Sequence, residues 1–86
     1  MKKKNYYVYL LISKKDNHIK SYVGYTNNLK KRINKHNSNK GAKSTRGRFW
    51  ILGYKRKFIS KSKAMKFEYI LKKNRKFRNK IKDIYV

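Results

Sequence analysis

The longest apolar run in the sequence, Tyr6 to Ile12 within the stretch NYYVYLLIS, is also its most constraining feature. The run is rich in aromatic and β-branched residues, and the polar segment KKDN follows it directly. A second segment of the same character, IKSYVGYT, comes next. Two such segments separated by a short polar turn are typical of a β-hairpin. We therefore expect the fold to be built around this hairpin.

The charge of the chain predicts its class of partner. Among 86 residues there are 27 lysines and arginines but only three acidic residues, giving a formal net charge of +24. A chain of this length forms one domain, and such a charge destabilises its compact state by self-repulsion. Basic residues from end to end imply a polyanionic partner. Nucleic acid is the leading candidate, and an anionic membrane surface is the second.

Several other classes of protein are disfavoured. The sequence has no cysteine, which excludes disulfides and thiolate metal sites and favours a reducing compartment, the cytoplasm or nucleoid. The basic start before an apolar run is also typical of a signal peptide. That run is short and tyrosine-rich, however, and no small-residue cleavage site precedes KKDN, so a strand is the favoured interpretation. No segment is long enough to span a bilayer.

The rest of the chain predicts two helices and a third strand. NLKKRINKHN has helical spacing with Thr26 or Asn27 as its N-cap, and KAMKFEYILKKN is expected to form a helix capped by Ser60 or Ser62. Between them FWILGYKRKFI predicts a third strand, with a β-bulge at Gly53. The tail RKFRNKIKDIYV has weak helical spacing. The order β-β-α-β-α predicts an α+β fold, a three-stranded antiparallel sheet flanked by helices, with a possible extra C-terminal helix.

Each helix carries a charged or titratable residue on an otherwise apolar stripe. The stripes at i, i+3, i+4 and i+7 are Leu29, Arg32, Ile33 and His36 in the first helix and Ala64, Phe67, Glu68 and Leu71 in the second. We expect Arg32, His36 and Glu68 to converge on one face of the sheet. One interpretation is structural: a partly buried Arg–Glu ion pair beside a packing histidine. The other is phosphodiester chemistry, in which a carboxylate holds a metal, a guanidinium binds phosphate and an imidazole moves a proton.

The hairpin contains tyrosines that could likewise be either packing residues or catalytic residues. Side chains alternate along a strand, so Tyr7 and Tyr9 face one side of the sheet, and Tyr22 shares a face with Gly24. A glycine inside a strand often marks the close approach of another group. Each tyrosine taken singly is better explained by packing than by chemistry.

The ordered set of these residues resembles the GIY-YIG nuclease family. The sequence has YVY at 7–9, YVG at 22–24, and then Arg32, His36 and a helical Glu68. Tyrosine stands where the family's first motif has glycine. The segments HNSNKGAKSTRGR and SKAMKFEYILKK are similar to the small stand-alone bacterial members. The resemblance covers about residues 6–73 of a single domain, 1–86, and leaves 74–86 as a basic extension.

The resemblance implies an α/β sandwich and metal-dependent hydrolysis of phosphodiester bonds in DNA. Position by position, Tyr9 and Tyr22 correspond to the motif tyrosines, Arg32 to the phosphate clamp and Glu68 to the ligand of one Mg²⁺ or Mn²⁺. His36 stands where members place a residue that assists the base. Tyr9 is expected to take the proton of the attacking water, which requires the metal and cationic neighbours to lower its pKa from the free value of about 10.

The loop after the first helix is expected to hold the DNA backbone. Its candidate contacts are Lys43, Ser44, Thr45, Arg46 and Arg48. The alternative is a solvated loop. DNA is expected more than RNA as the partner, with structured or damaged DNA in repair or recombination as the candidate substrate, and no small-molecule cofactor is expected. The main alternative function is a non-catalytic basic nucleic-acid-binding protein. A peripheral membrane protein is disfavoured because neither helix has a large apolar face.

Overall fold

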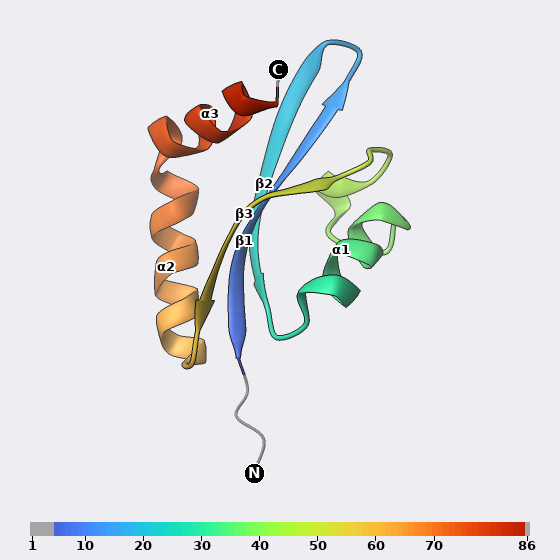
Figure 1. Ribbon diagram of the computed structural model, residues 1–86. Helices are drawn as coiled ribbons and strands as arrows, with labels where there is room; N and C mark the ends of the chain where they lie inside the picture. Colours follow the sequence, from blue (N-terminus) through green and yellow to red (C-terminus); the bar gives the residue numbers. More distant parts are fainter. Residues whose placement is uncertain (1–4, 86) are drawn as a thin grey trace.

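The computed structural model describes residues 5–85 and has three layers, with an antiparallel sheet between helices (Figure 1). In chain order the elements are β1 (Tyr6–Lys15), β2 (His18–Thr26), α1 (Leu29–Asn37), the short 3₁₀ helix η1 (Lys43–Thr45), β3 (Ile51–Phe58), α2 (Lys61–Lys73) and α3 (Arg75–Ile84). The strand order is β2-β1-β3. The α+β fold and the extra C-terminal helix predicted from the sequence are confirmed. Within residues 5–85, no helix is both long and apolar enough to cross a membrane.

The apolar run found first in the sequence forms the central strand, β1. Six consecutive residues, Val8 to Ser13, are buried, because helices cover both faces of β1 and a strand flanks it on each side. Lys14 and Lys15 are exposed where β1 extends beyond β3 and is paired only with β2. A strand buried on both faces needs a continuous apolar sequence rather than an alternating one.

A two-residue turn sets the register of the hairpin. Asp16 and Asn17 have φ values of 52° and 66°, and Lys15 pairs with His18. Turns with positive φ at both central positions match the twist of paired strands, and Asp and Asn tolerate that conformation. The resulting register places Tyr9 opposite Gly24.

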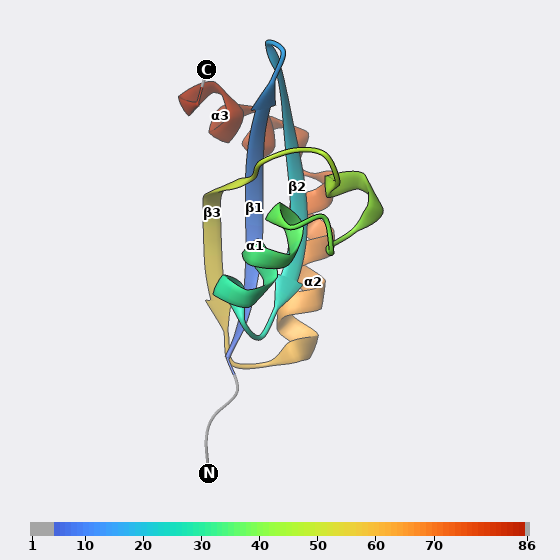
Figure 2. The same cartoon turned by 90° about the vertical axis from the view of Figure 1, so that its right-hand side faces the viewer.

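The two faces of β1 form two separate cores. Val8, Leu10 and Ile12 pack with Ala64 and Leu71 of α2. Phe77 and Ile81 of α3 add to this core, so residues of the expected extension belong to the folded domain. On the other face the buried cluster is Tyr9, Leu11 and Trp50, covered by Leu29 and Ile33 of α1. Figure 2 shows α1 in front of the sheet and α2 behind it.

Local sequence signals explain where the helices begin and β3 bends. Asn28, not Thr26 or Asn27, caps α1, because its Oδ1 accepts a hydrogen bond from the N–H of Lys31 at 3.1 Å. Ser60 caps α2 as predicted. The bulge at Gly53 is also confirmed: the β1–β3 register shifts between Leu10 and Leu11, so that Gly53 has no partner.

The arrangement of the helices corrects one prediction from the sequence. Arg32 and His36 lie on α1, whereas Glu68 lies on α2, and these two helices cover opposite faces of the sheet (Figure 1). The three side chains therefore do not converge on one face. The helical spacing correctly identified which residues share a stripe, but it carried no information on which face each helix covers.

Candidate active site

A buried tyrosine–histidine pair is the centre of the candidate site. Tyr9 projects from β1 and His36 from the last turn of α1, and both side chains have 0% exposure. The Tyr9 hydroxyl lies 2.9 Å from Nε2 of His36. The other ring nitrogen of His36, Nδ1, lies 3.0 Å from the hydroxyl of Thr45. The imidazole is thus held at both nitrogens inside the domain.

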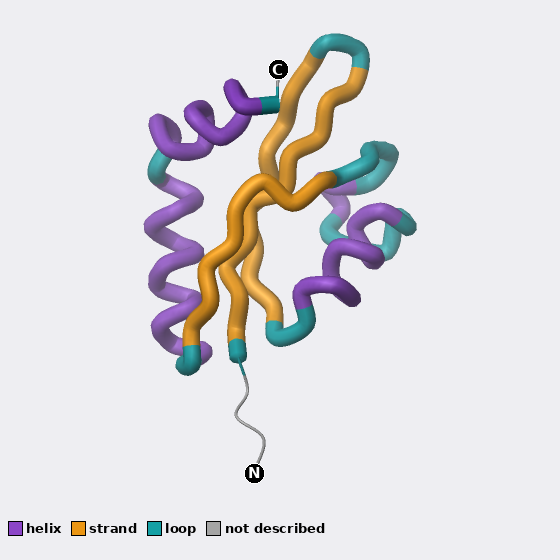
Figure 3. Tube along the Cα trace, in the orientation of Figure 1, coloured by secondary structure: helices purple, strands orange, loops and turns teal. Residues whose placement is uncertain are grey.

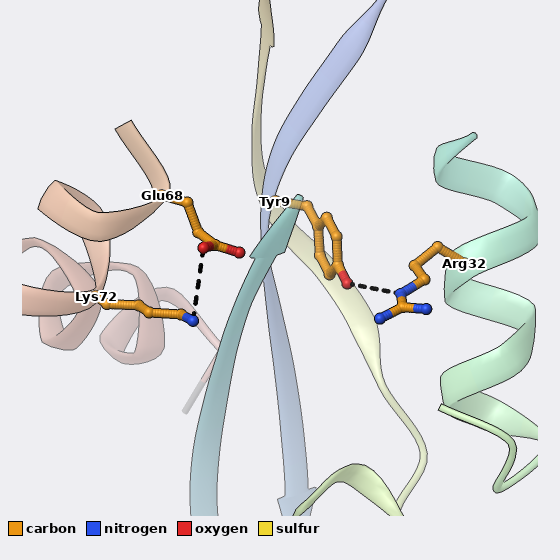
Figure 4. Close-up of polar contacts among 4 residues, drawn as sticks. All are labelled: Tyr9, Arg32, Glu68 and Lys72. Atoms are coloured by element: carbon orange, nitrogen blue, oxygen red, sulfur yellow. Dashed lines mark hydrogen bonds and ion pairs between the residues drawn. The ribbon is translucent and has the colours of Figure 1, made fainter. Parts of the chain in front are cut away.

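Arg32 connects this pair to the surface. It lies one turn before His36 on α1, and its Nε donates a hydrogen bond to the Tyr9 hydroxyl at 3.4 Å (Figure 4). Arg32 also lines an open polar hollow of about 230 Å³. The other residues around this hollow are Thr26, Asn27, Asn28, Lys31 and Lys35. Helical spacing could have added Lys31 and Lys35 to the sequence-based site, since they flank Arg32 on α1.

Tyr22 and Gly24 of β2 shape the site from the sheet. The Tyr22 ring packs against the His36 ring, with centroids 4.9 Å apart, and so forms a wall of the site. A Cβ atom at Gly24 would lie 2.5 Å from the hydroxyl of Tyr9. The glycine is therefore the place where the phenol crosses β2, and the close approach predicted at Gly24 is confirmed.

Glu68 reaches the site from the opposite side of the sheet. Figure 4 shows its carboxylate pointing from α2 toward the strands, with Tyr9 and Arg32 beyond them. Its side chain is 18% exposed, and Oε1 lies 3.6 Å from Nζ of Lys72 one turn later. Within residues 5–85 the ion pair of Glu68 is made with Lys72 and not with Arg32, so the buried Arg–Glu pair considered from the sequence is not formed.

Burial keeps the central pair neutral. Burial raises the pKa of Tyr9 to about 12, despite the opposing hydrogen bond from Arg32. Burial also lowers the pKa of His36, and the nearby charge of Arg32 lowers it further. The hydrogen bond to Tyr9 raises the pKa of Arg32, which stays charged. In the protein without a metal, desolvation of the phenolate outweighs the attraction of one guanidinium. A pKa lowered by a bound metal and cationic neighbours stays a prediction.

The loop between α1 and β3 divides into exposed and structural residues. Figure 3 shows this connection on the α1 side of the sheet. Lys43, Ser44 and Arg46 are exposed, as a phosphate-binding loop requires. The side chain of Thr45 is buried, so it offers no surface to DNA, contrary to the sequence-based prediction.

Arg48 also departs from the predicted role. Its Nε donates to the Ser13 hydroxyl at 3.1 Å, and one Nη donates to the main-chain carbonyls of Ser13 and His18, each at 3.0 Å. These bonds tie the loop to the end of the hairpin. Arg48 is a tether in this structure because its donors are directed at the protein rather than at solvent.

Gly41 is a site residue that the sequence analysis did not single out. A Cβ atom at this position would lie 2.5 Å from Nδ1 of His36 and 3.1 Å from its Cα. The loop can approach the imidazole this closely only because Gly41 has no side chain. No local sequence pattern marks such a contact between a loop glycine and a helix.

The residues present can hold a divalent cation only with help from substrate. Within the described part of the chain, no three His, Cys, Asp or Glu side chains gather into a metal-binding group. Mg²⁺ is commonly held by one or two carboxylates together with substrate phosphate oxygens and waters. Glu68 fits that limited role, since its only ion-pair partner among residues 5–85, Lys72, is 53% exposed and weakly held.

Comparison with known proteins now places the chain in a family. The sequence model of one protein family, the GIY-YIG catalytic domain, matches residues 5–82. The chain belongs to the GIY-YIG family. Membership implies a nuclease that acts on nucleic acid. The match extends past residue 73 and into α3, in agreement with the packing of that helix on the sheet.

The relatives are small bacterial GIY-YIG proteins. A UPF0213 protein of Oceanobacillus iheyensis is 47% identical over 74 residues, which cover 84% of this chain and 81% of that protein. A UPF0213 protein of Bacillus pumilus is 44% identical over 87 residues, covering 100% of this chain and 83% of that protein. The solution NMR structure of a UPF0213 protein from Bacillus halodurans is 40% identical, with a TM-score of 0.50 over 93% of this chain and 84% of that one.

Proposed function

We propose that this GIY-YIG domain is a divalent-metal-dependent endonuclease that hydrolyses phosphodiester bonds in DNA. The observation that carries the proposal is the buried Tyr9 hydroxyl, held between Arg32 and His36 and lying across Gly24 toward the edge strand. Packing alone gives no reason to bury the Tyr9 hydroxyl and the His36 imidazole together in so thin a domain. Structured or damaged DNA, as met in repair or recombination, is the proposed substrate.

Arg32 would bind the scissile phosphate. A guanidinium has five N–H donors, and the bond to Tyr9 uses one of them. Its planar fork matches two phosphate oxygens, and its charge opposes the negative charge that develops at phosphorus. The polar hollow that Arg32 lines with Lys31 and Lys35 is the proposed position of the neighbouring backbone. The exposed Lys43, Ser44 and Arg46 would extend this contact.

A neutral Tyr9 can deprotonate water only if it passes on its own proton. His36 is the acceptor within reach, with Nε2 at 2.9 Å from the hydroxyl. In the proposed step, the attacking water forms a bond to phosphorus, the P–O bond to the leaving oxygen breaks, and that oxygen takes a proton from solvent. An O–H bond of the water breaks as its proton moves to the Tyr9 oxygen. The original Tyr9 proton moves at the same time to Nε2 of His36. This relay needs no free tyrosinate, which a pKa of about 12 makes scarce at neutral pH.

Glu68 would hold one Mg²⁺ or Mn²⁺ against the substrate. When bound, such an ion supplies Lewis-acid stabilisation of charge on the phosphate oxygens. The carboxylate would contribute one oxygen ligand from the α2 side of the edge strand, while Arg32 acts from the α1 side. The alternative, a non-catalytic nucleic-acid binder, explains the charge of +24 but assigns no role to the buried pair or to the only glutamate.

Replacing Tyr9 with phenylalanine tests the proposal, with Tyr7→Phe as a matched control on the same strand. Tyr9→Phe removes one oxygen and should lower cleavage by about a hundredfold or more, the scale of general acid–base catalysis. DNA affinity should stay unchanged in both variants. Cleavage would be measured on supercoiled, branched and single-stranded DNA and on RNA, with Mg²⁺, Mn²⁺ or EDTA. Equal activity of the two variants would contradict the assignment, and a wild type without activity on any substrate would favour the binder.

A further inference from the structure

The hydroxyl of Thr45 makes two hydrogen bonds whose directions can be deduced. It lies 2.7 Å from the carbonyl oxygen of Ala42 and 3.0 Å from Nδ1 of His36. A carbonyl oxygen can only accept, and a threonine hydroxyl has one hydrogen. That hydrogen is therefore donated to Ala42, so toward His36 the hydroxyl can only accept. Nδ1 of His36 must then carry a hydrogen.

The contacts on the opposite side of the imidazole are compatible with the same tautomer. Arg32 Nε donates to the Tyr9 oxygen, so the phenol hydrogen is free to point elsewhere. Nε2 of His36 lies 2.9 Å from this oxygen. A neutral imidazole with hydrogen on Nδ1 presents a lone pair at Nε2, which accepts the phenol hydrogen. Every hydrogen bond in the chain that runs from Arg32 at the surface to Ala42 in the loop then has one donor and one acceptor.

We propose that Thr45 is a positioning residue that fixes His36 in the Nδ1–H tautomer and thereby makes Nε2 the proton acceptor for Tyr9. The effect on the rate rests on the proposed nuclease function, whereas the tautomer itself does not. When the Tyr9 proton moves to Nε2, the ring becomes a cation, and its Nδ1–H stays on the Thr45 oxygen. An acceptor oriented in advance stabilises the imidazolium without reorganisation.

The surroundings of Thr45 fix its position more closely than a surface loop would. The indole Nε1 of Trp50 donates to the main-chain oxygen of Thr45 at 2.8 Å, and both side chains are buried. The loop can lie against the imidazole ring of His36 because Gly41 has no side chain: a Cβ atom there would be 2.5 Å from Nδ1 of His36. The contact between Thr45 and His36 thus depends on Trp50 and Gly41 as well as on the short helix η1.

The experiment compares Thr45→Val, which keeps the shape but removes the acceptor, with Thr45→Ser, which keeps the hydroxyl. The tautomer of His36 would be read from its ring ¹⁵N shifts in long-range ¹H–¹⁵N spectra, with the exposed His18 as internal reference. Wild type and Thr45→Ser should show hydrogen on Nδ1. Thr45→Val should shift the ring toward the Nε2–H tautomer, because its Nδ1–H has lost its acceptor. Single-turnover cleavage by Thr45→Val should fall by about a hundredfold, with unchanged DNA affinity and rescue in Thr45→Ser.

The outcomes separate this proposal from the proposed function. A wild-type spectrum with hydrogen on Nε2 would overturn the tautomer assignment, whatever the activity. So would a folded Thr45→Val variant that keeps the wild-type tautomer. If Thr45→Val does not fold, the proposal is tested by the tautomer of His36 in the wild type and by the cleavage rate of Thr45→Ser, which should match the wild-type rate. A wild type that cleaves nothing but has hydrogen on Nδ1 would overturn the nuclease function while supporting the assignment of the tautomer.

Discussion

Desolvation favours the neutral form of both Tyr9 and His36, because each side chain is buried and its charged form would be poorly hydrated. The pKa of Tyr9 rises to about 12 and that of His36 falls below its ordinary value. The titratable or charged groups facing His36 are Tyr9, Tyr22 and Arg32, and only Arg32 is charged at neutral pH. A neutral donor therefore faces a neutral acceptor, which is the starting state of a proton relay.

The relay predicts a specific pH dependence of cleavage. Protonation of His36 fills the acceptor site, so the rate should fall on the acid side with a midpoint below about 6.5, the ordinary histidine pKa. Above that midpoint the rate should reach a plateau and stay level up to about pH 9, because Tyr9 acts in its neutral form. The measurement is a single-turnover pH–rate profile, with His36→Gln as the variant that should lose the acid limb. A rate that instead climbs steadily toward high pH would indicate a tyrosinate base.

The elements bring the site together at the edge strand rather than on one face. Gly24 has no side chain, so the phenol of Tyr9 from β1 lies across β2 on the side of the sheet that α1 covers. Helix α2 covers the other side. Arg32 on α1 and Glu68 on α2 therefore lie on opposite faces of the sheet. A substrate phosphate lying along the outside of β2 could be contacted from both helices, which neither helix could achieve alone.

Replacing Glu68 with glutamine tests this division at the level of α2. The variant loses one i,i+4 pair with an exposed lysine, so the free energy of unfolding should change by less than about 0.5 kcal/mol. Cleavage should fall at least about a hundredfold, since metal-ion stabilisation of phosphate charge is worth several kcal/mol. Lys72→Gln is the matched control, because it breaks the same pair and keeps the carboxylate. Chemical denaturation and cleavage rates would be measured for both, and joint loss of folding and DNA affinity in Glu68→Gln would make Glu68 structural.

At the scale of the whole molecule, the net charge of +24 is spread over one small domain with three acidic residues. The same charge that attracts a polyanion repels itself in the folded state. Two thin cores of mostly medium-sized side chains must offset this repulsion. Bound DNA and dissolved salt should therefore both stabilise the fold, while salt competes with DNA.

Salt should consequently act in opposite directions on stability and on binding. Raising it screens self-repulsion, so the thermal unfolding temperature of the free protein should rise. Over the same range the DNA affinity should fall steeply, by a log–log slope of about −0.9 for each phosphate neutralised. Thermal melts and binding titrations across one salt series would measure both. An affinity that does not respond to salt would rule out binding dominated by phosphate contacts.

Local sequence patterns predicted the strands and helices and singled out Tyr9, Arg32 and His36, which the structure brings together. The run at Tyr6 to Ile12 predicted a strand, which the structure confirms as β1, and helical spacing placed Arg32 and His36 one turn apart on α1. These features depend on local backbone geometry and on the spacing of apolar residues, both of which can be deduced from residues close together in the sequence. The resemblance then supplied the family and the roles proposed for Tyr9 and Glu68.

The contacts between distant residues, and the effect of burial on their pKa values, followed from tertiary packing alone. Helical periodicity does not say which face of a sheet a helix covers, so Glu68 was expected on the wrong side. Burial depends on every neighbour at once, so neither the interior position of Thr45 nor the raised pKa of Tyr9 could be deduced from local sequence. The contact of Thr45 with His36, nine residues apart, exists because Trp50 and Gly41 fold the loop against α1.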